Sequence, residues 1–479
     1  MRGGSVPLGR WKWAVYSAIL LTAAPAAVAQ GTSHWTVKPE WVQAHEEFLA
    51  SDAMQGRGSA THDEEVTATY VASELLGYGL KTAPGMTGYI QRAAVVQPVL
   101  DGHATIAGGS ATLAEGSDFH LIMATGQTAS GPLLRVEAKD EAKDIAQTKV
   151  TRGAVVLLDH VPADKPGLQL VRALWRSGAV AALVQEDAST QKYLTMIGGE
   201  TRIPIRLEDA PTRPNGVTIA ALTPAAMAKL SGLKDGETVS VTVHATPQTA
   251  PRFTYNAIGY LPGTDPKAGT ILLTAHLDHL GMKAAANGDG IYNGANDDAA
   301  GTTAVLELAH ALGSGPPLRR SVLFVCYGSE EAGELGSTYF GEHPPVPLKD
   351  LVANLEFEMI GNQDPKMPKG VLLLTGWERS NLGPALKENG ALLGPDPYPE
   401  QRFFERSDNY ALALKGVVAH TAAGWGTVPT YHQPDDDLQH LDLPFMTAAI
   451  QSLVTPVRWL ADSDFVPKWN AGGEPKAGK

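Results

Sequence analysis

Hydrophobic residues recur along the chain at spacings that change from one region to the next. In residues 61–80 the apolar side chains repeat at helical intervals, and Thr61 and Glu64 have the spacing of a capping box. Gly77 and Gly79 follow, as is common at the end of a helix. The pattern therefore predicts a helix in this region.

Between about residues 98 and 245 the pattern changes to short β-rich runs separated by Gly, Pro and Asp. Runs of this kind are typical of a small α+β or β-barrel-like module. The clearest predicted elements are strands at 154–158, 181–184 and 239–243 and a helix at 168–177.

After Pro262 and Gly263, buried-type strands alternate with apolar-periodic helices. This alternation predicts a mainly parallel sheet with helices on both faces. The predicted strands are 271–275, 321–327 and 351–357, and the predicted helices are 299–312, 331–340 and 445–460.

The first 29 residues have the pattern of a signal peptide. Basic residues precede the apolar stretch 13–21, and small residues end at Ala27-Val28-Ala29. A membrane anchor is the alternative, but the stretch is shorter than the roughly 20 residues that a span needs. Cleavage after Ala29 would export the chain to the periplasm or out of the cell, and no later segment is predicted to span a membrane.

Composition narrows the possible chemistry. The chain has 479 residues, 43% of them apolar, a net charge of −13 and a single Cys, Cys326, which is predicted to lie in the core. A lone Cys excludes an intrachain disulfide framework and thiolate metal clusters, so any metal must be bound by His, Asp or Glu. The acidic balance argues against a nucleic-acid-binding protein, which needs a basic surface.

Polar clusters follow several predicted strands, where α/β proteins bind their ligands. His276-Leu277-Asp278-His279 suits a metal ligand with an orienting carboxylate, or is simply a polar strand end. Ser329-Glu330-Glu331 contains two adjacent carboxylates, which repel each other unless a cation lies near them. One carboxylate would then bind a metal while the other acts as a general base. The alternative is that both acids complement the dipole of the helix that follows. Asp297 and Asp298 precede a helix, where an N-cap explains one of them but not both.

Two further clusters are acidic. Glu356 and Glu358 share one face if their segment is a strand. His432 precedes the run Asp435–Asp437, which is interpreted as a solvated turn. His420 is interpreted as a packing or surface residue.

Taken in order, these motifs resemble those of the dizinc aminopeptidases of metallopeptidase family twenty-eight. The motifs that carry the resemblance are His276-x-Asp278, Gly294-Ala295-Asn296-Asp297-Asp298-Ala299-Ala300-Gly301, Ser329-Glu330-Glu331-x-Gly333, Glu358-Met359-Ile360-Gly361 and His432. The resemblance implies a zinc-exopeptidase fold, a phosphorylase/hydrolase-like α/β sandwich with a mainly parallel or mixed sheet, and an inserted β-rich α+β protease-associated domain. It divides the chain into a signal peptide (1–29), a split catalytic domain (35–97 and 250–465), the insert (98–248) and a C-terminal tail (466–479).

The resemblance also implies two zinc ions, or other divalent metals, bound by His276, Asp297, Glu331, Glu358 and His432. Asp297 would bridge the two ions. His276 and Glu358 would complete one site, and Glu331 and His432 would complete the other.

Two more residues receive roles from the resemblance. Asp278 would orient His276, and Glu330 would be the general base and later the acid. The Asp297–Asp298 peptide bond is expected to be cis. Glu358 stands where Asp is frequent in the family, so its longer side chain puts the metal preference in question.

By resemblance, the exported enzyme hydrolyses the first peptide bond of peptides that have a free N-terminus. Three alternatives are a carboxypeptidase that removes C-terminal acidic residues, a glutaminyl-cyclase-like enzyme with one zinc, and a non-catalytic receptor on the same fold. A basic pocket for a substrate carboxylate would indicate the first of these.

Overall fold

The computed structural model of the chain describes residues 1, 35–136, 152–158, 178–188, 190–191, 201–209, 217–248, 250–283 and 288–476. By its internal contacts the chain forms two units, Met1–Trp35 and Thr36–Lys479, and the sheets and the candidate site all belong to the second. The predicted signal peptide beyond Met1 and the predicted helix at 168–177 lie outside the described residues. No described helix is both long enough and apolar enough to cross a membrane.

In the described part of the chain, the larger sheet has nine strands in the order β20-β19-β21-β18-β14-β17-β13-β1-β9. The strands β21, β18, β14 and β17 are parallel at its centre, and β13, β1 and β9 continue the sheet in antiparallel pairs. This mixed sheet with a parallel centre confirms the predicted fold class. The strands are β1 (Ile90–Val96), β9 (Arg206–Leu207), β13 (Arg252–Leu261), β14 (Thr270–His276), β17 (Ser321–Tyr327), β18 (Leu351–Glu358), β19 (Leu372–Leu374), β20 (Leu393–Pro395) and β21 (Ala419–Ala423).

The central strands form because their sequences are almost continuously apolar, which suits strands that are covered on both faces. Every residue of β14 and of β17 is buried, including Cys326, as predicted. Thr270 of β14 pairs with Ser321 of β17, and the register continues until His276 lies beside Tyr327. The carboxyl ends of these two strands are therefore level at one edge of the sheet.

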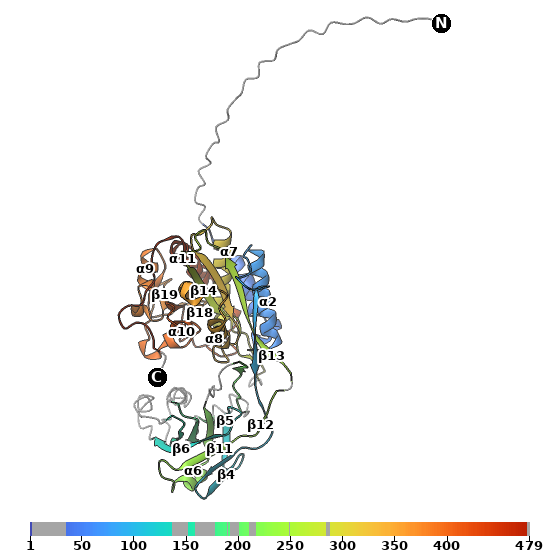
Figure 1. The fold of residues 1–479 in the computed structure, drawn as a ribbon, viewed down its shortest axis with the longest axis vertical. Helices are drawn as coiled ribbons and strands as arrows, with labels where there is room; N and C mark the ends of the chain where they lie inside the picture. The colour runs from blue at the N-terminus through green and yellow to red at the C-terminus, as the bar shows by residue number, and fades with distance from the viewer. Residues whose placement is uncertain are drawn as a thin grey trace. The chain divides into compact units, whose positions relative to one another are not determined.

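Helices cover both faces of this sheet. Helices α8 and α10 pack in one apolar cluster with alternate strand residues such as Leu272, Leu323 and Val325. Helix α7 contacts β14, β17 and β18 but contributes no residue to that cluster in the described chain, so it lies on the opposite face. Helices α1 and α11 pack on α7. Helix α2 packs on β13 (Figure 1). The helices are α1 (Pro39–Leu49), α2 (His62–Gly77), α7 (Ala300–Gly313), α8 (Leu335–Glu342), α9 (Leu382–Glu388), α10 (Asn409–Ala413) and α11 (Leu443–Asp462), and the short helical turns are η1 (Asp52–Arg57), η2 (Ala295–Ala299), η3 (Leu348–Asp350), η4 (Trp377–Arg379), η5 (Pro399–Gln401), η6 (Phe403–Glu405) and η7 (Leu438–His440).

The helix after β17 begins later than predicted, at Leu335. Gly333 and Glu334 adopt left-handed backbone, with φ of 111° and 58°, and turn the chain before the helix can start. The amides of both residues donate to the carbonyl of Glu330. Glu330 and its neighbour Glu331 therefore lie on a loop between a strand and a helix.

A second sheet lies within residues 105–242. Its described part has eight strands in the order β4-β3-β11-β6-β7-β8-β10-β5, of which β6, β7, β8 and β10 are parallel. Apolar residues of alternate positions form a cluster on each face, and α6 (Pro224–Leu230) packs in one of them. The strands are β3 (Thr105–Gly108), β4 (Ala111–Ala114), β5 (Phe119–Met123), β6 (Ala129–Val136), β7 (Val155–Leu158), β8 (Ala181–Gln185), β10 (Thr218–Leu222) and β11 (Thr238–Thr242), and two small pairs are β2 (Val99–Leu100) with β12 (Ala245–Thr246) and β15 (Gly281–Met282) with β16 (Ile291–Tyr292).

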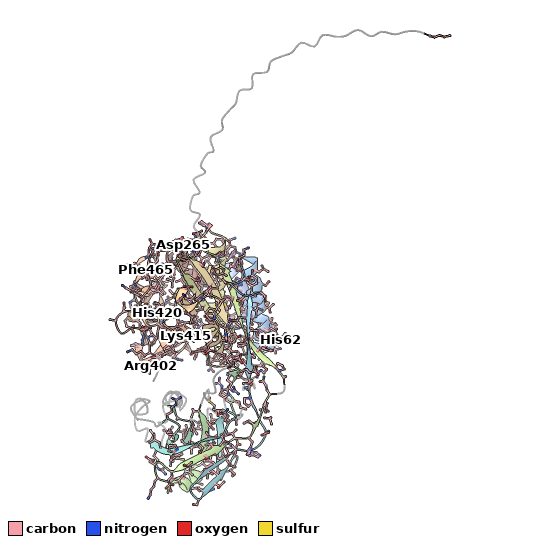
Figure 2. All side chains as sticks on the ribbon, viewed as in Figure 1. His62, Asp265, Arg402, Lys415, His420 and Phe465 are labelled. Carbon is pink, nitrogen blue, oxygen red and sulfur yellow. The ribbon has the colours of Figure 1, made fainter. Side chains whose placement is uncertain are left out.

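His420, which is labelled in Figure 2, is a packing residue of β21, as predicted. It is fully buried, its Nδ1 lies 2.8 Å from the Thr375 carbonyl oxygen, and its Nε2 lies 2.6 Å from Ser380 Oγ. Burial lowers its pKa to about 4, so the ring is neutral at neutral pH. This histidine therefore belongs to the core and not to the candidate site.

Glu46 of α1 is a buried acid between α1 and α7. Its side chain is fully inaccessible, and Thr303 Oγ1 donates a hydrogen bond to it at 2.8 Å. Burial raises its pKa from an ordinary value of 4.5 to about 8. Between these pH values the folded chain keeps a proton on Glu46 that the unfolded chain releases, so this carboxyl lowers the free energy of unfolding as the pH rises.

In the wild type, Glu46 is expected to lower the free energy of unfolding by on the order of 4 kcal/mol as the pH rises from 4.5 to 8, because one pKa unit corresponds to about 1.4 kcal/mol. We predict that Glu46→Gln, which cannot titrate, removes this part of the pH dependence. Urea unfolding of the wild type and the variant at both pH values measures this difference. Glu47→Gln removes an exposed carboxyl next to it and is expected to leave the pH dependence unchanged. The same pH dependence in Glu46→Gln and the wild type would contradict the prediction.

Candidate functional site

The strand ends bring polar residues from distant parts of the sequence to one edge of the larger sheet, as expected for parallel strands. His276 is the last residue of β14, and Glu358 is the last residue of β18. Glu330 and Glu331 follow β17 on its loop. Asp297 lies in η2, directly before α7.

Asp297 lies between two groups of possible metal ligands. Its Oδ1 is 3.2 Å from His276 Nε2, and the ligand atoms of His276, Asp297 and Glu358 all lie within 4.8 Å of one another. Its Oδ2 is 3.2 Å from His432 Nε2, which is itself 3.0 Å from Glu331 Oε1. The five ligands expected from the sequence are thus brought together around one carboxylate.

His279 joins the second group, although the sequence analysis gave it no role. Its Nδ1 is 3.0 Å from Glu331 Oε1, and the ligand atoms of His279, Asp297 and Glu331 also lie within 4.8 Å of one another. Gly294 makes room for the ring, because a Cβ there would lie 2.5 Å from His279 Cγ. The available signal was its place in the same strand-end motif as His276, three residues further on.

The donor set fits a divalent cation such as zinc. Among the described residues, Asp297 Oδ2 and Glu331 Oε1 are buried without accepting a hydrogen bond, and neither nitrogen of His279 forms one. Buried oxygen and nitrogen atoms without such partners are destabilising unless a cation binds them. Imidazole and carboxylate are ligands that zinc takes in the absence of thiolates.

The Asp278 carboxylate holds the loop that carries Glu330. Its Oδ1 accepts a hydrogen bond from Glu330 N at 2.9 Å, and its Oδ2 accepts one from Ser59 Oγ at 2.5 Å. The carboxylate is 3.8 Å from His276 Nδ1, whose nearer partner, at 3.1 Å, is the backbone carbonyl of Asp278. The hydrogen bonds of the Asp278 side chain thus fix the glutamate loop, while its main chain contacts the imidazole.

The charges of the site are strongly unbalanced. Burial raises the pKa of Glu330 well above its usual value, and the neighbouring Glu331 adds to this effect. Burial also acts to raise the pKa of Asp297, but the imidazoles of His276 and His432 beside its carboxylate hold that pKa well below its usual value. Burial would lower the pKa of His432, yet Glu331 and Asp297 raise it to about 10. So many carboxylates in one place favour a bound cation.

Asp436 holds the backbone on which Asp297 is placed. Its carboxylate accepts hydrogen bonds from the amides of Asn296 and Asp297, at 2.9 and 3.0 Å. The interpretation of Asp435–Asp437 as a solvated turn is therefore wrong for Asp436, which is 1% exposed. Its backbone partners are 140 and 139 positions away in the sequence, so no local pattern revealed them.

Asp298 connects the ends of β14 and β18. It accepts hydrogen bonds from Met359 N at 3.0 Å and from His276 N at 3.3 Å. The Asp297–Asp298 peptide bond is cis, as predicted. Met359 and His432 adopt left-handed backbone, with φ of 53° and 57°, which is uncommon outside positions that function or packing determines.

The region that contains these strand ends matches a known family. Residues 256–455 match the model of peptidase family M28, a range that runs from β13 to α11 and includes every candidate ligand. This part of the chain resembles peptidase family M28. The family resemblance inferred from the sequence motifs is thereby confirmed.

Curated proteins that are similar to this chain are aminopeptidases by name. It is 26% identical to the "Probable lipoprotein aminopeptidase LpqL" of Mycobacterium tuberculosis, over 65% of this chain and 64% of that protein. It is 25% identical to "Aminopeptidase YwaD" of Bacillus subtilis, over 36% of each chain. The chain thus covers less than two thirds of the length of either relative.

Solved structures share the fold. An aminopeptidase from Aneurinibacillus sp. strain AM-1 superimposes with a TM-score of 0.54 at 17% identity, over 89% of this chain and 94% of that one. BSAP, a zinc aminopeptidase from Bacillus subtilis, gives a TM-score of 0.51 at 19% identity, over 89% and 96%. At these identities the likeness concerns the fold of the chain and not its chemistry.

Glu64 of α2 is a buried carboxylate next to the candidate site, and the sequence analysis gave it no role there. It accepts hydrogen bonds from Ala60 N at 2.6 Å, Thr254 Oγ1 at 2.8 Å, Tyr255 N at 2.8 Å and Ser329 Oγ at 2.8 Å. Burial raises its pKa to about 8. The capping-box position thus connects the start of α2 to the residue that precedes Glu330.

Arg57 forms hydrogen bonds to several loops of the candidate site. The guanidinium is completely buried and donates hydrogen bonds to the backbone carbonyls of Leu49 and Asn293 at 2.6 Å, Gly294 at 2.8 Å and Leu277 at 3.0 Å. Leu277 follows the first candidate ligand, and Gly294 precedes the η2 turn that carries the shared aspartate. One side chain thus holds both loops.

We predict that Arg57→Met lowers the free energy of unfolding by about 3–5 kcal/mol, because four buried carbonyls lose a charged donor. Arg57→Lys is expected to recover only part of the loss, since one ammonium cannot reproduce the guanidinium fork. Chemical denaturation measures both effects. Arg152→Met, at an exposed position, is the control and is expected to change stability by less than about 0.5 kcal/mol. Equal stability of Arg57→Met and the control would refute this role.

Proposed function

We propose that this protein is a zinc-dependent aminopeptidase that removes the first residue of peptides with a free N-terminus. The observation that carries the proposal is the position of Asp297, whose two carboxylate oxygens face two separate groups of imidazole and carboxylate ligands. The match of residues 256–455 to peptidase family M28 and the aminopeptidase names of the relatives support it.

Two zinc ions are proposed to share Asp297. His276 and Glu358 would complete one site, and Glu331 and His432 would complete the other, with His279 as a further imidazole beside it. Although Glu358 is longer than the more frequent Asp, its ligand oxygen lies within 4.8 Å of those of His276 and Asp297, which supports its role. Zinc bound by such ligands lowers the pKa of a water molecule and polarises a carbonyl group.

Glu330 is proposed as the general base. Its carboxylate belongs to neither ligand group among the described residues, and Glu330 directly precedes the candidate ligand Glu331 on the loop after β17. It would take one proton from the attacking water and deliver that proton to the nitrogen of the leaving amine, and would thereby return to its starting protonation state. Asp278 would hold Glu330 in place through the Glu330 amide.

Metal analysis combined with a substrate panel tests this function. The purified chain is expected to hold two zinc ions, to hydrolyse aminoacyl p-nitroanilides and to leave N-blocked analogues intact. A chelator should abolish turnover, and added zinc or cobalt should restore it. One zinc per chain would favour the glutaminyl-cyclase-like alternative, cleavage from the C-terminus would favour the carboxypeptidase, and an inactive chain without zinc would favour the receptor.

We further propose the organisation expected from the sequence: a signal peptide at 1–29, a catalytic domain formed by 35–97 and 250–465, a protease-associated-like insert at 98–248 and a tail at 466–479. The eight-stranded sheet within residues 105–242 supports a separate insert. Export to the periplasm or out of the cell is the corresponding proposal for localisation, and N-terminal sequencing of the exported protein tests it.

A further inference from the structure

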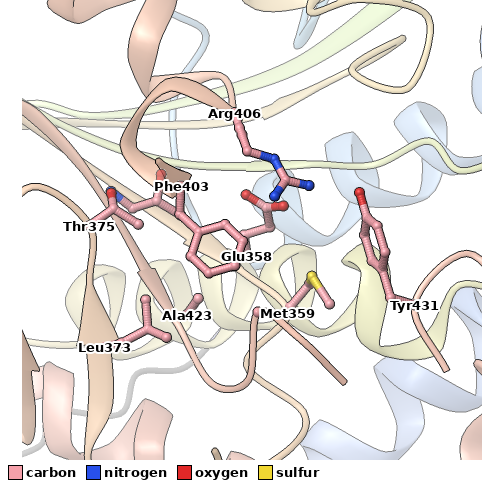
Figure 3. Close-up of a pocket in the computed structure, with 10 residues that line it drawn as sticks. Glu358, Met359, Leu373, Thr375, Phe403, Arg406, Ala423 and Tyr431 are labelled. Atoms are coloured by element: carbon pink, nitrogen blue, oxygen red, sulfur yellow. The ribbon is translucent and has the colours of Figure 1, made fainter. Parts of the chain in front are cut away.

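A pocket opens beside Glu358, the candidate ligand at the end of β18 (Figure 3). Much of its lining is apolar and comes from β18, β19, β21 and the η6 turn. The apolar side chains include Met359, Leu373, Phe403 and Ala423. The pocket therefore adjoins the proposed zinc site and is placed to receive part of a bound substrate.

Arg406 is the cationic residue among those that line this pocket. Figure 3 shows its guanidinium next to the Glu358 carboxylate, with Tyr431 on the other side. The side chain is partly buried, and its guanidinium lies 5.1 Å from the centre of the Phe403 ring. It is thus held against an aromatic face at the mouth of the candidate site.

The Arg406 side chain forms no hydrogen bond or ion pair with any residue that the structure describes. The nearby Glu358 is assigned to zinc in the proposed function. No hydrogen bond or ion pair joins Arg406 to the Glu358 carboxylate beside it, so the donors of the guanidinium are unused among the described residues. Partial burial of unused donors is unfavourable, and a guanidinium presents parallel donors that match the two oxygens of a carboxylate. The geometry therefore leaves a binding position for an external anion.

We propose that Arg406 binds a carboxylate of the peptide substrate, so that the enzyme prefers substrates with an acidic group in this pocket. The inference rests on the proposed peptidase function and adds the substrate class. The carboxylate has two possible sources: the side chain of an N-terminal Glu or Asp, or the free C-terminus of a short peptide. Both present the same group to the guanidinium.

Two matched substrate pairs separate the sources. Glu-p-nitroanilide and Gln-p-nitroanilide differ only in the side-chain carboxylate, and the dipeptide Leu-Gly and its amide differ only in the terminal carboxylate. The measurement is the ratio of kcat/KM within each pair, for the wild type and for Arg406→Gln. A charge-assisted hydrogen bond corresponds to a fall of about 10–100-fold in the ratio of the pair that uses Arg406.

Arg406→Lys keeps the positive charge but lacks the paired donors of the guanidinium, so the kcat/KM ratio of the affected pair should fall less than in Arg406→Gln. Arg406→Lys also serves as the second variant if Arg406→Gln fails to fold. Arg402→Gln removes an exposed arginine that pairs with Glu405 and should leave both ratios as in the wild type. The zinc content of the Arg406 variants is expected to equal that of the wild type, which separates substrate binding from an effect on Glu358.

A fall in the first ratio assigns the pocket to an acidic N-terminal side chain, and a fall in the second assigns it to the terminal carboxylate. A pocket for a terminal carboxylate is also expected of the carboxypeptidase alternative. Hydrolysis of the two p-nitroanilides, which carry no C-terminal amino acid, separates the aminopeptidase from that alternative. Unchanged ratios in an active, zinc-containing Arg406→Gln enzyme overturn the Arg406 inference and leave the proposed function intact. A wild-type chain that holds no zinc and hydrolyses none of the four substrates overturns both.

Discussion

Replacing Glu330 with Gln is expected to lower kcat for aminoacyl substrates by about 10²–10⁴-fold, the usual contribution of a general acid–base group. The amide has nearly the same shape but accepts no proton from water. The hydrogen bond from the residue 330 amide to Asp278 does not involve the side chain, so the loop should keep its position. Because Glu330 is in neither described ligand group, zinc content should stay at the wild-type level.

Steady-state kinetics and metal analysis on the same preparation test this expectation. Glu342→Gln, at an exposed position in the last turn of α8, is the matched control and should retain wild-type kcat. Wild-type turnover by Glu330→Gln would remove Glu330 from the role of base. Loss of zinc together with activity would instead identify Glu330 as a ligand.

The second large effect is expected from Asp297→Asn. One oxygen of the Asp297 carboxylate lies 3.2 Å from His276 Nε2 and the other lies 3.2 Å from His432 Nε2. The amide replaces one of these oxygens with an NH2 group, which cannot bind a metal. Loss of an outer-shell partner already weakens metal binding by about 10–100-fold, so loss of a shared ligand should weaken zinc binding by at least about 100-fold.

Competition titration with a zinc chelator measures this affinity, and kcat/KM should fall with zinc occupancy. Asp435→Asn removes an exposed carboxylate of the neighbouring acidic run and should change neither quantity. If Asp297→Asn kept its full zinc content and activity, Asp297 would not be the shared ligand, and the proposed two-zinc arrangement would fail with it.

The sequence predicted much of the fold because local patterns determine it. Strand β14 is largely apolar between Thr270 and His276, so its burial in the centre of a sheet was expected from the sequence pattern. Helix α7 starts where the apolar periodicity starts, and its buried residues occupy nearly the whole helix. The late start of α8 was not predictable in this way, because it depends on left-handed backbone at Gly333 and Glu334.

The sequence analysis did not predict the residues that support the site. Arg57 lies 220 positions from Leu277, whose carbonyl it binds, and Asp436 lies 139 positions from the Asp297 amide. No local sequence pattern identifies these two buried residues, because each forms its hydrogen bonds with residues that are distant in the sequence. Arg406 is similar, because the pocket that it lines joins strands from several parts of the chain.

The sequence by itself determined the elements, their order, the strand-end motifs and the family, because apolar spacing and short motifs are local properties. Tertiary structure decided that Asp297 lies between two ligand groups and that His279 joins one of them. It also decided that Arg406 lies beside Glu358 without a hydrogen bond or ion pair from its side chain to any described residue. Parallel strands bring their carboxyl ends to one edge whatever their separation in the chain. Distances and charges at that edge therefore depend on the packing of the whole sheet.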